Sequence, residues 1–317
     1  MKDTVKHAFF SVVIPLYNKE NYIASAISSV LNQTFQDFEV IIINDGSTDK
    51  SESLVRGIKD SRIKVFTTKN KGASSARNHG ISLAKSNNIA LLDADDYWHS
   101  NHLFELKKLM QTFPDAGLFC NNYEIYHTQS MVRPARFNFD FNKECLLLDD
   151  FFKASLINGV AWTSAVGFKK NKFNALGGFN PNLTTGQDTD LWIRFALKHE
   201  IAFNPIITAS YLFYVENSLF KNEYNAVRYD FINSYSQEEQ ANPSLKRYLD
   251  INRYAVALRC KLHNDQDLYK KLKSEIEYSH LNFKQRCLLS CPKFILSWVK
   301  KCHSYLLKKQ VYLTAYR

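Results

Sequence analysis

Residues 10–18 read FSVVIPLYN, a short apolar and β-branched run that ends in a polar turn. A run of this length and composition is typical of a strand buried on both faces of a sheet. Helical spacing follows in the next apolar residues, which are Ile23, Ile27, Val30 and Leu31. A buried strand followed by a helix predicts the first unit of a parallel sheet covered by helices.

The same alternation repeats along the first hundred residues. We expect a second buried strand at 39–43 and two further strands at 63–68 and 89–92, with helices between them. Asp49 and Glu52 have the spacing of a capping box for the second helix. We therefore expect an α/β fold with a mostly parallel central sheet flanked by helices on both faces.

The third helix and the later elements are less regular in sequence. Ser74 or Ser75 is expected to cap the third helix, which should run to Lys85. Further expected elements are a helix at 146–157, a strand at 163–168, a break at Gly177–Gly178, a helix at 187–199 and a strand-rich segment at 201–214. After residue 216 the pattern is helical and basic, so we expect an α/β domain over 1–215 and a helical C-terminal region over 216–317.

The composition of the 317 residues is that of a globular protein, with 45% hydrophobic and 23% charged residues. Because no run of about 18 apolar residues occurs, we expect no transmembrane helix, and the polar N-terminus predicts no signal peptide. We therefore expect a cytoplasmic protein. Free thiols are expected at the scattered cysteines, namely Cys120, Cys145, Cys260, Cys287, Cys291 and Cys302.

Polar turns follow three of the expected strands, at residues 15–18, 44–47 and 93–96. In open α/β sheets, ligands bind beyond the carboxyl ends of the strands. We therefore expect these three turns to converge on one ligand-binding crevice.

The turn at 93–96 reads Asp-Ala-Asp-Asp directly after a buried strand. Clustered carboxylates repel one another unless a cation or solvent compensates their charge, and a hard divalent ion could also bridge a diphosphate. A solvated acidic turn is the alternative interpretation. The strand context favours a metal site.

Three other residues carry functional hypotheses beside structural ones. Asp45 could accept a hydrogen bond from a pyrimidine base, or it could form an Asx-turn or cap a helix. Arg77 could meet a phosphate, or it could be a surface arginine. Asp188 opens a helix in Gln187-Asp188-Thr189-Asp190 and could act as a general base or merely as a capping acid.

Five segments in order resemble the family 2 glycosyltransferases of the GT-A fold. They are SVVIPLYN from Ser11, IINDGSTD from Ile42, the Asn70-x-Gly-Ala…Ala76-Arg-Asn78 stretch, LDADDYW from Leu92, and QDTDLW from Gln187. The similarity covers roughly residues 8–215. It implies a Rossmann-like catalytic domain that transfers a sugar from a nucleotide diphosphate with inversion of configuration.

The resemblance also implies roles for individual positions. Pro15, Tyr17 and Asn18 match the first nucleotide-facing loop, Asp45 the aspartate that reads the pyrimidine, and Arg77 the nucleotide-side arginine. Asp93, Ala94 and Asp95 match the D-x-D motif, with Asp95 the main ligand of Mn²⁺ or Mg²⁺ and Asp93 beside it. Asp188 matches the catalytic base. Gln187 replaces the usual glutamate before that base, and Asp190 is a second candidate for the role.

The net charge of +10 is concentrated near the C-terminus, where 18 Lys and Arg stand against 9 Asp and Glu after residue 220. Basic residues lie beside aromatic and aliphatic ones, which suits an anionic membrane surface. We therefore expect a protein on the cytoplasmic face of the inner membrane with a glycan or lipid-linked glycan acceptor. The alternative is a helix packed on the catalytic domain. No recognition motif accompanies the charge, so no nucleic acid is expected.

The expected reaction is transfer from a nucleotide diphosphate sugar, such as a UDP-sugar, in cell-surface polysaccharide or lipopolysaccharide synthesis. Two other classes remain open. A non-catalytic nucleotide-sugar-binding or membrane scaffold protein would share the same turns. A nucleotidyltransferase would normally carry a Gly-rich phosphate loop after the first strand, where this chain has Pro-Leu-Tyr-Asn.

Overall fold

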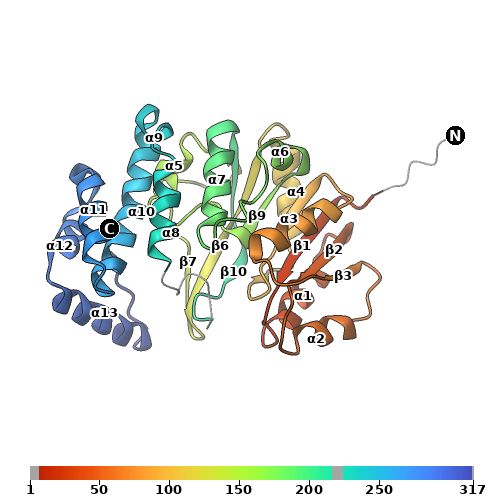
Figure 1. The fold of residues 1–317 in the computed structure, drawn as a ribbon. Helices are drawn as coiled ribbons and strands as arrows, with labels where there is room; N and C mark the ends of the chain where they lie inside the picture. The colour runs from red at the N-terminus through yellow and green to blue at the C-terminus, as the bar shows by residue number, and fades with distance from the viewer. Residues whose placement is uncertain (1–6, 216–223, 316–317) are drawn as a thin grey trace.

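The computed structural model describes residues 7–215 and 224–315 (Figure 1). Its first half contains four parallel strands in the order β3-β2-β1-β4. Their bounds are Phe10–Leu16 for β1, Phe38–Asn44 for β2, Ile63–Thr67 for β3 and Asn88–Leu91 for β4. The four strands expected from the apolar runs are confirmed.

The sheet continues beyond β4 through a strand that runs the opposite way. β9 is antiparallel to both β4 and β6, whereas β10 is parallel to β6, so the sheet is mixed but mostly parallel. The short strands β5, β7 and β8 pair at the margins of β6 and β10. The bounds are Tyr97–Trp98 for β5, Leu118–Thr128 for β6, Met131–Pro134 for β7, Leu146–Leu147 for β8, Val166–Lys169 for β9 and Ile201–Tyr211 for β10.

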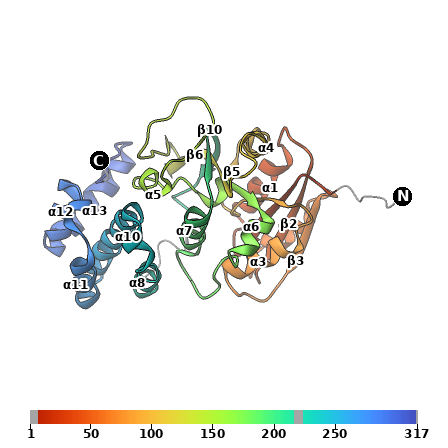
Figure 2. The same cartoon turned by 90° about the horizontal axis from the view of Figure 1, so that it is seen from above.

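Helices cover both faces of this sheet. Seen from above, α1 and α4 lie on one face, and α3, α6 and α7 lie on the other (Figure 2). Their bounds are Ile23–Leu31 for α1, Ser51–Gly57 for α2, Ala73–Leu83 for α3, His102–Thr112 for α4, Lys170–Ala175 for α6 and Gln187–Lys198 for α7. This layered architecture is the expected fold class.

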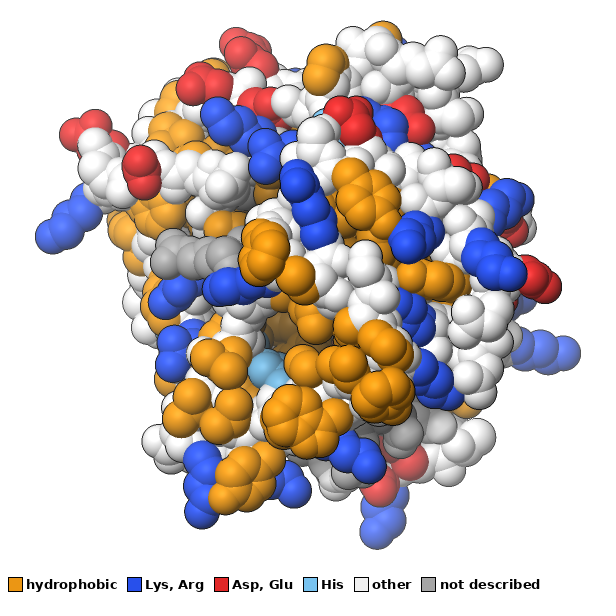
Figure 3. All heavy atoms as spheres, turned by 90° about the vertical axis from the view of Figure 1, so that its left-hand side faces the viewer, with side chains coloured by type: hydrophobic (Ala, Val, Ile, Leu, Met, Phe, Trp, Pro, Cys, Tyr) orange, Lys and Arg blue, Asp and Glu red, His pale blue; other side chains and the backbone are white. Residues whose placement is uncertain are grey.

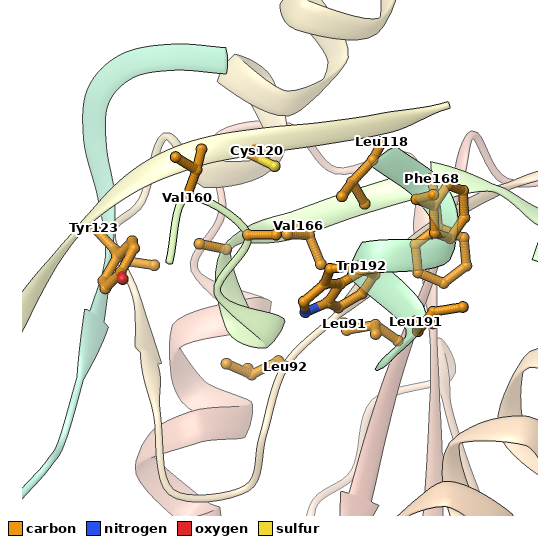
Figure 4. Packing of buried hydrophobic residues seen from close by; sticks show 14 of the residues in the cluster. Leu91, Leu92, Leu118, Cys120, Tyr123, Val160, Val166, Phe168, Leu191 and Trp192 are labelled. Carbon is orange, nitrogen blue, oxygen red and sulfur yellow. The ribbon is translucent and has the colours of Figure 1, made fainter. Parts of the chain in front are cut away.

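The core that fixes α7 on the sheet is aromatic and aliphatic. Trp192 and Leu191 of α7 pack towards Phe168 and Val166 of β9 and Leu91 of β4 (Figure 4). All five side chains are buried. Burial of such side chains stabilises a fold by roughly 1.5–3 kcal/mol each. These contacts fix the position of α7 against β9 and β4.

The C-terminal region is helical, as expected. Its central helix α10 contacts α8, α9, α11, α12 and α13. The bounds are Asn225–Asn233 for α8, Glu238–Ala241 for α9, Pro243–Leu262 for α10, Gln266–Glu275 for α11, Phe283–Ser290 for α12 and Lys293–Lys308 for α13. The expected boundary at 215/216 adjoins residues 216–223, which lie outside the described residues.

The helical region is closely packed against the segment between β8 and α7. Tyr248 of α10 contacts Phe152, with ring centroids 5.8 Å apart. Tyr235 donates a hydrogen bond to Asp190 of α7 at 2.7 Å. Helices from the C-terminal region therefore help to hold elements of the sheet domain.

Two later elements differ from the expectation. The helix expected at 146–157 is wrong, since Leu146–Leu147 pair with β10 and only Phe151–Ala154 form a helix, α5. Asp150 starts that helix because its side chain accepts a hydrogen bond from the Lys153 N–H at 2.9 Å. The strand expected at 163–168 begins later, because Thr163–Ala165 form a 3₁₀ turn before β9.

Both expected helix caps are also wrong. Glu52 does not close a capping box, because its carboxylate accepts a hydrogen bond from Asn44 Nδ2 at 2.8 Å. Neither Ser74 nor Ser75 caps α3, which starts after Gly72 at a φ of +88° and ends at Leu83. A positive φ favours glycine at this position.

All six cysteines are free thiols, as expected. Among the described helices, none is both long and apolar enough to cross a membrane.

Candidate active site

Three loops meet at the carboxyl ends of β1, β2 and β4. The Asn18 N–H donates to Ser47 Oγ at 3.1 Å, and the Thr48 N–H donates to Asn18 Oδ1 at 2.8 Å, so the loops after β1 and β2 are joined. Lys19 Nζ lies 2.7 Å from Asp95 Oδ2, which joins the loop after β4. The convergence that strand order alone predicted is therefore observed.

The first loop presents its side chains unequally. Pro15 is half-buried within β1, while Tyr17 is 46% exposed. Asn18 has a φ of +49°, a conformation that asparagine tolerates better than most residues. Its amide is occupied by the second loop, so Asn18 shapes the loop and Tyr17 is the side chain free to contact a ligand.

The three carboxylates of the acidic turn lie in different environments. Asp93 accepts a hydrogen bond from Arg77 Nη2 at 2.6 Å, and Asp95 faces Lys19. Both side chains are partly exposed, at 24% and 21%. Ala94 between them is buried and holds the turn against the core. Two carboxylates thus stay accessible on the outer side of the turn.

Asp96 is the inward-facing member of the turn. Its carboxylate accepts hydrogen bonds from Ser164 Oγ at 2.5 Å, Trp162 Nε1 at 3.1 Å and the Leu212 N–H at 3.1 Å. Burial, together with the charges of Asp95 and Asp93, raises the pKa of Asp96 well above its ordinary value. Asp96 therefore anchors the turn to neighbouring segments.

Asp45 is 3% exposed and holds the loop that precedes α3. Its carboxylate accepts hydrogen bonds from the Lys71 N–H at 2.9 Å, the Gly72 N–H at 2.8 Å and Thr68 Oγ1 at 3.2 Å. It thus serves the start of α3, where the sequence pointed to a serine. Each carboxylate oxygen has two lone pairs, so Oδ2 can accept one more hydrogen bond.

Arg77 lies at the centre of the site. It is 6% exposed, its guanidinium packs 5.3 Å from the Phe179 ring, and its Nε and Nη1 have no hydrogen-bond partner among the residues described. Burial works to lower the pKa of Arg77, but the charges of Asp93, Asp188 and Asp95 outweigh it and raise that pKa. Asp93 is bonded directly to this guanidinium, and the charges of Asp95 and Asp188 also act on it.

Asp188 occupies the first turn of α7, next to the residue that opens the helix. Gly186 before it has a φ of +76°, and a Cβ there would lie 3.2 Å from the Phe231 ring, so this entry to the helix requires glycine. Asp188 Oδ1 accepts a hydrogen bond from the Thr189 N–H at 2.8 Å. No lysine or arginine forms an ion pair with Asp188 among the described contacts, and its carboxylate is half-buried.

Gln187 and Asp190, on either side of Asp188 in this motif, are both buried. Asp190 binds Arg194 Nε at 3.1 Å and accepts a hydrogen bond from Tyr235 at 2.7 Å. Its carboxylate is committed to these partners, which argues against Asp190 as a second candidate base. Gln187, which replaces the usual glutamate, is 7% exposed.

The sequence interpretation missed three residues of the site. Lys19 pairs with Asp95, and Tyr211 packs on Trp162 in a tilted arrangement with ring centroids 3.8 Å apart. Trp162 donates a hydrogen bond to Asp96, so this ring pair adjoins the acidic turn, and burial together with the charges of the nearby acids raises the pKa of Tyr211. Lys19 adjoins a recognised motif, whereas nothing in the pattern near 162 or 211 indicates a site.

A divalent cation fits the outer side of the acidic turn. Magnesium-type ions are commonly held by one or two carboxylates plus substrate phosphates, and Asp95 and Asp93 offer such oxygens beside exposed space. Both carboxylates already lie against a cationic group, which shows that this position favours positive charge. Within 7–215 and 224–315, no three His, Cys, Asp or Glu side chains gather as a complete ligand set.

Comparisons with known proteins agree with this geometry. The sequence profile of Glycosyl transferase family 2 matches residues 11–176, and the chain belongs to this family. Over 123 residues it is 39% identical to the Escherichia coli UDP-Glc:alpha-D-GlcNAc-diphosphoundecaprenol beta-1,3-glucosyltransferase WfgD, covering 38% of this chain and 48% of that one. The matches span only 28% to 64% of the length of the rickettsial glycosyltransferases that this chain also resembles.

Solved structures share the fold. Staphylococcus aureus TarS 1-349 in complex with UDP-GlcNAc superposes with a TM-score of 0.59 at 16% identity, over 84% of this chain and 90% of that one. The mannosyltransferase PcManGT from Pyrobaculum calidifontis, in complex with GDP-Man and Mn²⁺, gives 0.54 at 16% identity, over 96% and 81%. At this identity the likeness establishes the GT-A fold.

Proposed function

We propose that this family 2 glycosyltransferase transfers a sugar, with inversion, from a nucleotide diphosphate sugar to a hydroxyl group of a glycan or lipid-linked glycan. The observation that carries the proposal is the convergence of the loops after β1, β2 and β4, which holds Asp93 and Asp95 partly exposed at the rim of the sheet. Residues 1–215 form the catalytic domain in this proposal, and residues 216–317 support it.

The donor lies across the three joined loops. Tyr17 offers an exposed ring beside the nucleotide, and Asp45 accepts the imide N–H of a pyrimidine base through its remaining lone pair. Pro15 and Asn18 shape the first loop, and the buried Ala94 holds the acidic turn against the core. A uridine nucleotide suits this arrangement, and the E. coli relative is named for UDP-Glc.

Asp95, with Asp93 beside it, would hold a Mn²⁺ or Mg²⁺ ion. When bound there, such an ion would supply positive charge that neutralises the diphosphate and stabilises it as a leaving group. Arg77 and Lys19 are the chain's own cations beside these carboxylates. They balance the acidic turn before the donor arrives, and the guanidinium of Arg77 can contribute to stabilising the negative charge that develops on the diphosphate.

Asp188 takes the proton of the acceptor hydroxyl. The hydroxyl oxygen forms a bond to the anomeric carbon while the bond from that carbon to the diphosphate oxygen breaks, and the electron pair leaves with the nucleotide. Attack from the face opposite the diphosphate inverts the configuration in one step. A half-buried carboxylate without a lysine or arginine partner in the described contacts is suited to a general base.

The proposed acceptor is a hydroxyl group of a glycan or lipid-linked glycan. The E. coli relative is named for a sugar linked to diphosphoundecaprenol, which supports a lipid-linked acceptor in cell-surface polysaccharide or lipopolysaccharide synthesis. The Trp162–Tyr211 pair adjoins Asp96 of the acidic turn and offers an aromatic surface for a sugar ring.

A panel of nucleotide sugars tests the proposal. We expect one donor to raise the unfolding temperature in the presence of Mn²⁺ or Mg²⁺ and to be hydrolysed slowly to nucleoside diphosphate. The same donor should do neither in EDTA. A protein that bound the donor without ever releasing the nucleoside diphosphate, with any acceptor extract, would be a binding protein instead of a transferase.

A further inference from the structure

The last long helix, α13, presents an aromatic stripe to solvent. Phe294, Trp298 and Tyr305 are 73%, 65% and 61% exposed. They recur at intervals of four and seven residues, so they lie on one face of the helix. Leu296, which points to the opposite side, is 5% exposed and packs inward. The aromatic face of this helix is therefore exposed to solvent.

Other apolar side chains enlarge this surface. Phe283 of α12 is 80% exposed, and Val311 and Leu313 after α13 are 44% and 57% exposed. Lys293, Phe294, Ser297, Trp298 and Lys301 together form one open face of α13. Figure 3 shows apolar side chains gathered on this side of the molecule with Lys and Arg around them. Exposed apolar patches of this kind mark interaction sites.

The charges on this surface have one sign. Lys301 and Lys308 lie on the same face of α13 as the aromatic stripe, and Lys300 and Lys309 are also exposed at this end of the chain. No Asp or Glu follows Glu277 in the sequence. An anionic partner is therefore favoured, whereas a second copy of the same surface would bring like charges together.

The surface is held firmly to the rest of the chain. Lys261 Nζ donates to the Cys291 carbonyl at 2.7 Å, and the Tyr269 hydroxyl donates to the Leu289 carbonyl at 2.8 Å, which fixes the turn between α12 and α13. After α13, Tyr312 packs 4.5 Å from the His127 ring of β6. Docking through α13 would thus set the orientation of the sheet domain as well.

We propose that this surface, built by α12, α13 and residues 311–313, docks on an anionic lipid bilayer. Aromatic and aliphatic side chains enter the boundary between headgroups and acyl chains, and the flanking lysines contact lipid phosphates. The long lysine stems let the ammonium groups remain at headgroup level. The proposal does not require the transfer reaction, and its test measures no transfer.

Flotation of the full-length protein with vesicles tests the proposal. We expect binding to vesicles of phosphatidylcholine with one part in about three phosphatidylglycerol, weak binding to phosphatidylcholine alone, and loss of binding as salt screens the charges. Equal binding to both vesicle types, or none to either, would overturn it. The proposal would also be wrong if sedimentation velocity showed a stable dimer and this dimer did not bind vesicles.

Matched variants locate the surface. Replacing Phe294, Trp298 and Tyr305 by serine should weaken vesicle binding by about tenfold or more. Phe104→Ser on α4, which removes an aromatic side chain 51% exposed elsewhere, should leave it unchanged. If the triple variant floated like the wild type while Phe104→Ser did not, the assigned surface would be wrong.

A second pair of variants tests the charge. Lys300→Gln with Lys301→Gln should weaken binding to anionic vesicles by about tenfold, since each lysine near the surface adds electrostatic attraction. Lys59→Gln with Lys143→Gln removes two exposed lysines outside the surface and should have no effect. Unchanged thermal unfolding in each variant shows that binding, and not folding, was altered.

Discussion

The rim of the sheet and the helical region both contain clustered charges, but they use them differently. At the rim, Asp93 and Asp95 remain partly exposed, and each pairs with one cation. In the helical region Asp250 is fully buried, and its carboxylate contacts Lys246, Arg253 and His280 within 2.9 Å.

Two of the buried arginines, Arg77 and Arg253, show the same contrast. Arg253 directs its guanidinium at Asp250, Glu239 and Asn233, so each of its nitrogens has a partner. Arg77 uses only Nη2, towards Asp93. A network with every partner in place stabilises a fold, whereas one with open positions is arranged for a ligand. Substitutions should therefore affect catalysis at the rim and stability in the helical region.

The largest expected effect is on turnover, from Asp188→Asn. The amide keeps the shape of the side chain but cannot take a proton, so we expect transfer to fall by about a thousandfold. Donor affinity, measured by calorimetry, should stay within about twofold. Asp267→Asn changes an exposed acid in the first turn of another helix, α11, and serves as the matched control with full activity. Near wild-type turnover in Asp188→Asn would remove this residue from the mechanism.

Asp250→Ala should act on stability instead. Removing a fully buried carboxylate takes away the acceptor shared by Lys246, Arg253 and His280, and breaking a buried ion pair in this way typically costs about 3 kcal/mol or more. Urea unfolding should show this loss, while the turnover of the remaining folded protein stays close to that of the wild type. If Asp250→Ala kept its stability but lost transfer, Asp250 would serve catalysis and not stability.

A smaller effect concerns pH and a buried histidine in the scaffold. Burial lowers the pKa of His102 from 6.5 to about 3, and its Nδ1 lies 2.8 Å from Thr208 Oγ1. The unfolded chain therefore binds a proton that the folded protein excludes. The stability that neutral His102 provides is complete above pH 6.5 and is lost progressively as the pH falls towards 3.

The loss at pH 5 should be about 2 kcal/mol relative to neutral pH. Urea unfolding of the wild type and of His102→Gln at both pH values measures it, because the variant cannot take up that proton. The difference in unfolding free energy between the two proteins should shrink on acidification. A constant difference would show that His102 does not titrate as described.

Strand-level features were predictable from the sequence because buried parallel strands leave a strong local pattern. The runs that became β1 to β4 are mostly apolar, and topology alone brought the turns at 15–18, 44–47 and 93–96 together. The helix caps were not predictable. Asp45 serves the start of α3 from 27 positions away, and such a contact leaves no local signal.

The same limit applies to the site. Asp93, Asp95 and Asp188 could be chosen from motifs that follow strands or open a helix. Trp162 and Tyr211 could not, because they join the acids only once β9 and β10 have entered the sheet. Distant residues become neighbours through the mixed part of the sheet, where the sequence pattern is weakest.

The most direct measurement of the central claim is the affinity of UDP with and without Mn²⁺, for the wild type and for Asp95→Asn. We expect Mn²⁺ to tighten UDP binding by about tenfold or more in the wild type, as charge neutralisation of the diphosphate requires. The variant should bind UDP equally weakly under both conditions. Equal affinity in the wild type with and without the metal would contradict a cation-bound diphosphate at this rim.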